Sequence, residues 1–309
     1  MQDIFDTRLL QARRARAAAA ALGHDFLLQH AIEEIAFRLN GIRRDFAVAA
    51  DIGAQGGALA RSLAAVPSVG LVVSCDTVPE MLAQAPMPRV LADAAMLPFA
   101  HESLDLIVSA LSLHLVNDLP GALIQMRRAL RPDGLLLACV LGGDTLHELR
   151  ASLMQAELEM TGGASPRVAP MADVRDYGAL LQRAGFALPV ADADRLTATY
   201  ADIFALMQDL RGMGATNMLA ERARRPVGRR FFARAGDIYR ERFPAPGGRI
   251  AATFEIITLT GWAPHESQQK PLAPGSAAAR LADALGVPEH AAGDKAAFPL
   301  RSGPSGRGE

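Results

Sequence analysis

The sequence FAVAADIGAQGGALARSL, residues 46–63, combines three features that together predict a cofactor-binding turn in an open α/β sheet. An apolar run typical of a buried strand ends at Asp51, glycines follow, and a helix-like pattern of Ala and Leu comes next. A glycine-rich turn between a strand and a helix lets the backbone approach a nucleotide-type ligand closely. Gly53 and Gly57 fit this turn, whereas Gln55 stands where the D-x-G-x-G-x-G form has a glycine.

The composition of the chain narrows the classes of function. Its 309 residues suffice for one large α/β domain with additions, and its formal net charge of -1 gives no general reason to bind nucleic acid or an anionic membrane. Cys75 and Cys139 lie in apolar runs, which predicts buried, reduced thiols and a cytoplasmic protein. We find no apolar run long enough to cross a membrane, and the basic, Ala-rich start of the chain lacks the apolar core of a secretory signal.

The rest of the chain repeats the strand–turn–helix pattern, and continuous Val, Leu and Ile runs predict parallel strands that are buried on both faces. These predicted strands are residues 46–51, 70–76, 89–93, 104–111 and 134–141, with further strands at 186–190 and 253–262. Helices are expected within 7–39 and around 122–130, 146–160, 174–184 and 200–213, and a tight turn at 131–134. The expected organisation is a helical cap (1–45), a cofactor-binding domain (46–266) with helical insertions (144–250), and a mostly disordered tail (267–309).

Three acidic residues fall at the ends of successive predicted strands: Asp51, Asp76 and Asp93. The carboxyl ends of parallel strands meet at one edge of a sheet, so these side chains are expected to face one crevice. Asp76 follows Asp51 by about the interval at which dinucleotide folds place the acid that binds ribose hydroxyls, and Asp93 suits an adenine amino group. The alternative for each residue is that it caps the next helix.

Several motifs of the chain resemble a known family. The segment LADAAMLPFAHESLDLIVSALSLHLVNDLP (residues 91–120) resembles class I S-adenosylmethionine-dependent methyltransferases. Within that class the chain resembles the methyltransferase-fold assembly factor of respiratory complex I and its bacterial relatives. The motifs that carry this closer resemblance are IFDTRLL (4–10), SALSLH (109–114), VNDLP (116–120), GGDTLHELR (142–150), AGF (184–186), DLRGMGATN (209–217), GW (261–262) and HES (265–267).

The resemblance implies a Rossmann-like, seven-stranded, mostly parallel sheet that binds S-adenosylmethionine. It also implies a role in complex I assembly, by hydroxylation of an arginine on the iron-sulfur subunit nearest the quinone site. Carried over by position, Asp51, Gly53 and Gly57 would hold the methionine end of the cofactor, Asp76 the ribose and Asp93 the adenine side. With Gln55 and Ser109 these residues complete the expected cofactor site.

The residues that would carry the chemical step are less clearly marked. His114 follows the fourth predicted strand, where it could act as a base or as an orienting donor, or simply be satisfied by backbone groups. Asp144 follows the fifth strand and either lines the cleft or caps the next helix. No His is followed two positions later by Asp or Glu, so we predict no iron site of the two-His-one-carboxylate type and no other metal site.

Three functions remain open from the sequence. The first is an enzyme that modifies a protein side chain, by methyl transfer or arginine hydroxylation, in the cytoplasm or at the inner face of the membrane, where peripheral contact is possible. The second is a carboxyl O-methyltransferase for a small or carrier-bound acid. The third is a non-catalytic assembly chaperone whose cofactor pocket is degraded at Gln55. An arginine cluster either docks an acidic partner or forms a solvated helix face: Arg222, Arg224, Arg225, Arg229, Arg230 and Arg234.

Overall fold

The computed structural model describes residues 3–19, 23–225, 227–269, 283 and 285–287. The chain divides into two units, Met1–Glu266 and Ser267–Glu309. All helices and strands named below lie in the first unit. Most of the predicted tail, 267–309, lies outside the described residues.

A mixed sheet forms the centre of the first unit. Its strands are β1 (Phe46–Ile52), β2 (Val69–Asp76), β3 (Arg89–Leu91), β4 (Leu104–Ala110), β5 (Leu130–Leu141), β6 (Ala187–Tyr200), β7 (Pro244–Ala245) and β8 (Arg249–Trp262). Seven of these described strands follow one another in the order β3-β2-β1-β4-β5-β8-β6, and the short β7 pairs with β8. The pairs from β3 to β5 are parallel, and β8 runs antiparallel to its neighbours. The predicted Rossmann-like, mostly parallel sheet is confirmed.

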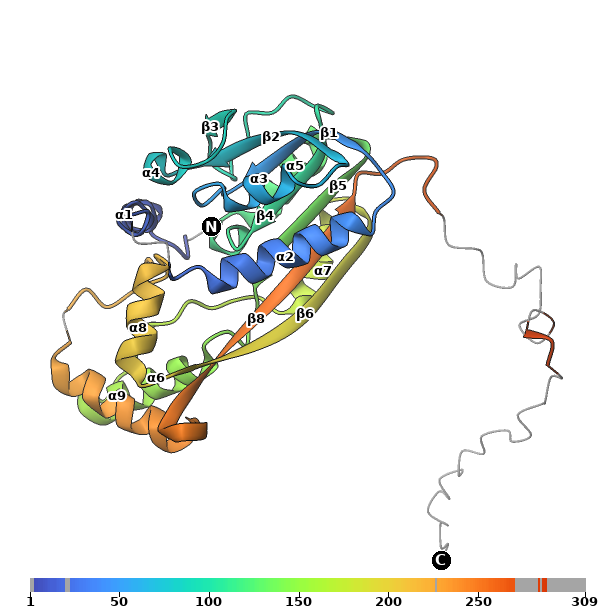
Figure 1. Ribbon diagram of the computed structural model, residues 1–309. Coiled ribbons are helices and arrows are strands. Elements are labelled where there is room, and N and C mark those ends of the chain that lie inside the picture. Colours follow the sequence, from blue (N-terminus) through green and yellow to red (C-terminus); the bar gives the residue numbers. More distant parts are fainter. Residues whose placement is uncertain (1–2, 20–22, 226, 270–282, 284, 288–309) are drawn as a thin grey trace, which may run out of the picture. The chain divides into compact units, whose positions relative to one another are not determined.

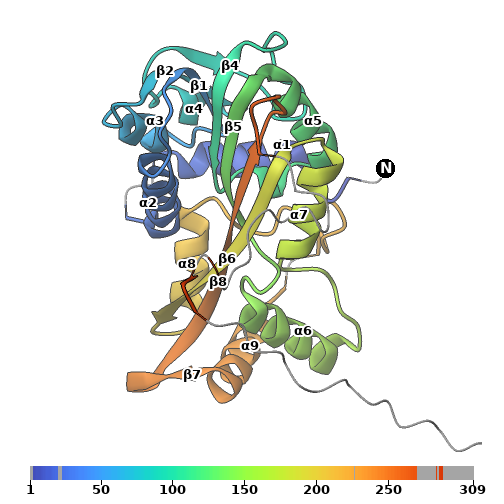
Figure 2. The same cartoon turned by 90° about the vertical axis from the view of Figure 1, so that its right-hand side faces the viewer.

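Helices cover both faces of this sheet. They are α1 (Thr7–Ala17), α2 (Phe26–Asn40), α3 (Ala58–Leu63), α4 (Pro79–Leu82), α5 (Leu119–Ala129), α6 (His147–Thr161), α7 (Val174–Arg183), α8 (Ile203–Gly212) and α9 (Arg229–Arg242), with short 3-10 turns η1 (Leu113–Leu115) and η2 (Pro246–Gly248). α2 and α3 pack on one face, and α5 and α7 pack on the other (Figure 1). α6, α8 and α9 gather around the part of β6 and β8 that extends beyond β5 (Figures 1 and 2).

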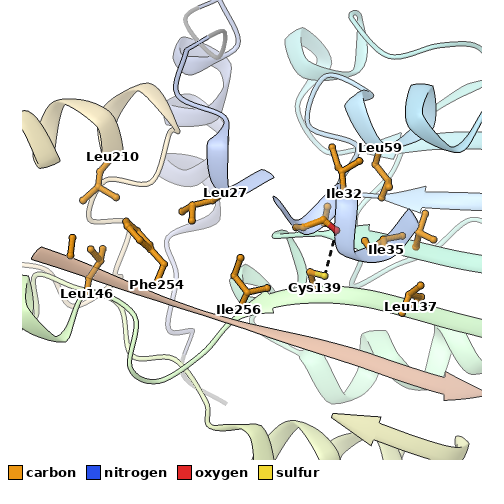
Figure 3. Packing of buried hydrophobic residues seen from close by; sticks show 14 of the residues in the cluster. Leu27, Ile32, Ile35, Leu59, Leu137, Cys139, Leu146, Leu210, Phe254 and Ile256 are labelled. Carbon is orange, nitrogen blue, oxygen red and sulfur yellow. Dashed lines mark hydrogen bonds between the residues drawn. The ribbon is translucent and has the colours of Figure 1, made fainter. Parts of the chain in front are cut away.

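The packing of α2 shows how apolar spacing fixes this arrangement. Leu27, Ile32 and Ile35 recur at helical spacing and are buried. Figure 3 shows them against side chains from α3, β5 and β8, where the Cys139 thiol also donates to the Ala31 carbonyl at 3.7 Å. Full burial of one such aliphatic side chain contributes about 1.5 to 3 kcal/mol. This face of the core therefore holds α2 against β4 and β5.

Three local predictions differ from the structure. The strand predicted at 186–190 continues as β6 to Tyr200, because the polar alternation of its second half suits an edge strand with one exposed face. The helix predicted from Tyr200 begins only at Ile203, after the N-cap Asp202. The turn predicted at 131–134 is a bulge inside β5: Leu104 pairs with Leu130 but Leu106 pairs with Leu135, so extra residues loop out.

Among the described residues, no helix is both long and apolar enough to cross a bilayer.

Candidate functional site

A cavity of about 700 Å³ opens at the carboxyl ends of the parallel strands. Its walls on the sheet side come from residues that follow β1, β2, β3 and β4. On the opposite side lie α1, the start of α2, α6 and the chain from α8 to Met218. Of the predicted site residues, the cavity is lined by Gly53, Gln55, Asp76, Asp93 and His114.

The glycine turn after β1 has the backbone that the sequence predicts. Gly53 and Gly57 both have φ of 76°, in the left-handed region that favours glycine. A Cβ on Gly53 would lie 1.9 Å from the Ser112 hydroxyl, and one on Gly57 would lie 2.5 Å from Cα of Ala85. Both positions therefore need glycine for conformation and for space.

Gln55 takes the same type of backbone conformation without being glycine, with φ of 44°. Its side-chain Nε2 donates to the carbonyl oxygens of Ala110 at 2.6 Å and Leu111 at 3.1 Å. The amide thus folds against the end of β4 and ties the turn to that strand. Leu111 also has a positive φ of 50°, so the two residues that meet here are both strained.

Asp76, the last residue of β2, has a fully buried side chain whose carboxylate accepts four hydrogen bonds. Two come from the backbone N–H groups of Gln55 at 3.0 Å and Val78 at 2.9 Å. The other two come from the guanidinium of Arg14 on α1, at 3.2 and 2.9 Å. Sequence reasoning missed Arg14, because nothing local marks a partner 62 positions away.

Asp51 and Ser109 lie beneath the cavity, not on its wall. Ser109 donates to the Ile52 carbonyl at 2.7 Å and so supports the strand that carries the turn. The Asp51 carboxylate is 1 % exposed, and neither oxygen makes a hydrogen bond within the described residues. Burial, and then the negative charge of Asp76, raise the pKa of Asp51 to about 7, while the Ala60 amide opposes this only weakly.

Asp93 and His114 stand at the two sides of the cavity floor. Asp93 follows β3, and its carboxylate accepts from the Ala95 amide at 2.9 Å. The His114 Nδ1 accepts a long hydrogen bond, 3.5 Å, from the Leu141 amide. Burial and the nearby charge of Arg14 lower the pKa of His114 to about 3, so the ring is neutral near pH 7. With Nδ1 accepting, Nε2 carries the proton, so the neutral ring has a hydrogen-bond donor at Nε2.

Asp144 does not line the cavity. Its carboxylate forms an ion pair with Arg195 of β6, and both side chains are about half exposed or more. The alternative role as helix cap also fails, because the N-cap of α6 is Leu146 and has no side-chain cap bond. Asp144 therefore lies beside Arg195 of β6, outside the lining of the cavity.

An N-terminal strap, residues 3–19, lines one side of the cavity and accounts for several of the motifs. Asn117 accepts from the Ile4 and Phe5 amides and donates to the Phe5 carbonyl, at 2.9 to 3.1 Å. Phe5 also forms a β-bridge with Leu219. The motifs IFDTRLL, VNDLP and DLRGMGATN thus meet at the roof of the cavity.

Beyond the cofactor turn the cavity is mostly apolar and rich in methionine. Methionine adapts its shape to a ligand, and such a wall also keeps water away from a reacting group. The side chains concerned are Leu146, Leu149, Leu153, Met171, Met207, Met213, Met218, Phe232 and Phe254. Arg167 also lies on this wall, held by Glu157 at 2.8 and 2.9 Å and stacked on the Phe231 ring at 4.5 Å. In the described part of the chain, no group of three or more His, Cys, Asp or Glu side chains is arranged to hold a metal ion.

The arginine cluster is divided between two places. Arg229, Arg230 and Arg234 belong to α9, where Arg234 pairs with Glu159 of α6 at 2.6 Å. Arg222 pairs with Asp6 of the strap at 3.1 Å. Part of the cluster therefore ties helices and the strap together, while Arg224 and Arg225 are exposed.

Comparison with known proteins agrees with this geometry. Residues 50–138 match the family model described as a methyltransferase domain. The chain is 40% identical over 282 residues to "Arginine-hydroxylase NDUFAF5, mitochondrial" of Mus musculus, which covers 89% of this chain and 82% of the mouse protein. It is 34% identical over 277 residues to "Malonyl-[acyl-carrier protein] O-methyltransferase" of Xylella fastidiosa (strain M23), which covers 85% of this chain and 90% of that enzyme.

Solved structures show the same fold at lower similarity. A protein from Bacillus halodurans C-125, named as a methyltransferase, superposes with a TM-score of 0.54 at 16% identity and covers 76% of this chain and 99% of that one. At such low identity this likeness concerns the fold alone. The similarity to the mouse protein extends far beyond the domain model. The chain therefore belongs to the family of the arginine-hydroxylase NDUFAF5, within the class I methyltransferase fold.

Proposed function

We propose that this chain binds S-adenosylmethionine and modifies an arginine side chain of a protein during the assembly of respiratory complex I. The observation that supports this most is the extent of the similarity to the mouse arginine-hydroxylase, 282 residues. That span exceeds the segment that matches the methyltransferase domain, residues 50–138, by far, so it includes much of the chain that forms the other walls of the cavity.

The residues present fit the cofactor. Gly53 lines the cavity with a backbone that passes close to Ser112, Gly57 lets the turn pack on Ala85, and Asp76 ends the second strand at the cavity with a fully buried carboxylate. Asp51 lies just below with an unpartnered carboxylate, which a cationic ligand above it would stabilise in its charged form. Gly53 and Gln55 would hold the methionine end, Asp76 the ribose and Asp93 the adenine side. When bound, S-adenosylmethionine supplies a methyl group that its sulfonium sulfur activates.

The remaining walls would position the substrate. His114 lines the cavity, and its Nε2–H would orient an acceptor group of the substrate. The methionine-rich wall would surround the aliphatic part of an arginine side chain and exclude water. We infer that the protein substrate is the quinone-proximal iron-sulfur subunit of complex I, met in the cytoplasm at the inner face of the membrane.

Two reactions on arginine remain to be separated. Methyl transfer needs only the cofactor and an aligned nitrogen, whereas hydroxylation adds an oxygen atom and needs an oxidant delivered to the same cavity. The two products differ in mass, since one gains a methylene group and the other an oxygen. The name of the mouse relative favours hydroxylation.

A second candidate is O-methylation of a carboxyl group on a carrier-bound acid, favoured by the 34% identity to the Xylella enzyme over 90% of its length. The apolar wall would accommodate an acyl chain as well as an arginine stem. Purified protein that forms a methyl ester on malonyl-loaded acyl carrier protein would support this candidate over the first.

The experiment that tests the main proposal deletes the gene in its own host and restores it as wild type, Asp76→Asn or Asp237→Asn. Asp76→Asn removes the charge that would bind ribose, while Asp237 is the control for the same substitution at an exposed position, where the carboxylate pairs with Arg240 on its own helix. We expect complex I activity and the modified arginine, found by mass spectrometry, to return with wild type and Asp237→Asn but not with Asp76→Asn. Unchanged complex I in the deletion strain would refute the proposal.

A further inference from the structure

Arg14 is the part of the candidate cofactor site that the family resemblance does not explain. Its guanidinium is 11% exposed and makes a bidentate ion pair with Asp76, whose side chain is fully buried. Each carboxylate oxygen of Asp76 accepts two hydrogen bonds, one from Arg14 and one from a backbone amide. A carboxylate has about four acceptor positions, so Asp76 has none left for a ribose hydroxyl.

Of these donors, Arg14 is the one that can leave. The amides of Gln55 and Val78 belong to the turns that follow β1 and β2, and their positions are fixed by the fold. Arg14 reaches Asp76 from α1 through a long side chain with several rotatable bonds. A ribose diol that binds Asp76 must therefore displace the guanidinium.

A displaced guanidinium needs another anion, because an unpaired buried cation is costly. Four other carboxylates line the cavity: Asp93 accepts from Ala95, Asp118 caps α5, Asp25 accepts from the Gln29 side chain, and Asp3 lies at the exposed start of the strap. Arg14 and His114 both line the cavity, and the charge of Arg14 helps to lower the pKa of that ring. The amino-acid end of the cofactor, which carries a carboxylate, is expected above the glycine turn that follows β1.

We propose that Arg14 exchanges partners when the cofactor binds: it releases Asp76 to the ribose and binds the cofactor carboxylate. This inference rests on the proposed function, since it takes S-adenosylmethionine as the ligand. It adds a cofactor-binding residue from outside the sheet and makes the strap part of the binding site.

The exchange needs only a rotation of one side chain, because other contacts hold α1 in place. The strap is fixed by Asn117 and by the bridge between Phe5 and Leu219. Farther along α1, the Arg13 guanidinium donates to the Asn217 carbonyl. The helix can therefore stay docked over the cavity while Arg14 moves from one anion to the other.

The test compares two ligands by calorimetric titration. S-adenosylmethionine has both the ribose and the carboxylate, whereas 5′-methylthioadenosine keeps the adenine and ribose but lacks the amino-acid end. The proteins are wild type, Arg14→Gln and the control Arg16→Gln. Arg16 is an exposed neighbour on α1 whose side chain donates to the Ala12 carbonyl of the same helix. Thermal unfolding of each variant establishes that it is folded.

Arg14→Gln frees Asp76 and removes the cation, so the affinities for the two ligands should change in opposite directions. We expect this variant to bind methylthioadenosine more tightly than wild type and S-adenosylmethionine about tenfold or more weakly, the size of a lost charged hydrogen bond. Arg16→Gln should match wild type for both. If Arg14→Gln bound both ligands more tightly by the same factor, Arg14 would only block the site. If its affinity for both ligands fell equally or did not change, Arg14 would only hold the strap. Either result overturns the exchange.

A failure of the proposed cofactor gives a different pattern. In that case wild type binds neither ligand, whatever the behaviour of the Arg14 variant. Binding by wild type together with any of the overturning patterns leaves the proposed function standing and removes the exchange alone.

Discussion

Asp51 on β1 and Ser74 on β2 are register partners in the parallel sheet, and both side chains are buried without a hydrogen-bond partner among the described residues. Paired residues on neighbouring strands point to the same face, so the two polar groups lie next to each other. Unpaired polar groups of this kind are rare in folded proteins and mark a place where a ligand or an ordered water completes the structure. Here they lie directly under the glycine turn.

The stability of the protein should fall as the pH rises from about 4 to 7, because of Asp51. Burial raises its pKa from 3.8 to about 7, so the folded state keeps a proton that the unfolded chain releases. The stabilisation by protonated Asp51 is fully present below the pKa of the unfolded chain. It is lost as the pH rises towards the pKa of the folded protein, at up to about 1.4 kcal/mol per pH unit. Denaturant unfolding of wild type and Asp51→Asn at pH 5 and pH 8 measures this. Asp51→Asn should remove most of the loss, and Asp237→Asn should not.

Two substitutions of Gln55 that both remove its side-chain amide should differ in their free energy of unfolding. Gln55→Ala and Gln55→Gly both lose the bonds to the Ala110 and Leu111 carbonyls. Only Gly also relieves the positive φ of 44°, which costs a residue with a Cβ about 1 kcal/mol. We therefore expect Gln55→Gly to be more stable than Gln55→Ala by about 1 kcal/mol. Equal free energies of unfolding would show that the turn holds no strain at this position.

Asn117 should control how tightly the N-terminal strap is held. Its side chain makes three hydrogen bonds to the backbone of Ile4 and Phe5. Each is worth about 1 kcal/mol, so Asn117→Ala should speed amide hydrogen exchange in residues 3–19 by tenfold or more. Asn40→Ala, at the exposed end of α2, is the matched control. Exchange that stays slow in Asn117→Ala would mean that the bridge to Leu219 alone holds the strap.

The central strands could be predicted from sequence because each is a continuous apolar run buried on both faces, as β1 and β4 show. The full length of β6 could not. Its second half, around Asp192 to Thr199, is an exposed edge whose residues pair with Arg38 and Asp144 of distant elements. Such a segment has neither a continuous apolar run nor a clear helical period, and only its partner β8 makes it a strand.

The residues of the candidate site also divide into those that the sequence predicts and those that it does not. Gly53, Gly57 and Asp76 follow directly from their positions at strand ends. Arg14 and Asn117 could not be found in this way, because their partners lie 62 and over 110 positions away and are chosen by the packing of the strap. The position of Asp144 after β5 allows either a place in the cleft or a helix cap, but its side chain pairs with Arg195 and does neither.

The contribution of Glu157 to the stability of the protein should depend on pH in the opposite sense to that of Asp51. The Arg167 guanidinium, and then Ser165, hold its pKa down at about 2, against a usual 4.5. A carboxyl with a lowered folded pKa stabilises the protein above the unfolded value, and this contribution is lost as the pH falls from about 4.5 towards 2. Allowing for partial solvent screening, Glu157→Gln should lower the free energy of unfolding by about 1 to 2 kcal/mol at pH 7, with a difference that shrinks below pH 4.5. Glu159→Gln, on the same helix, weakens surface contacts with Arg234 and Gln155 and should have a much smaller effect. If the Glu157 variant kept a constant deficit down to pH 3, its ion pair with Arg167 would not be what stabilises this wall of the cavity.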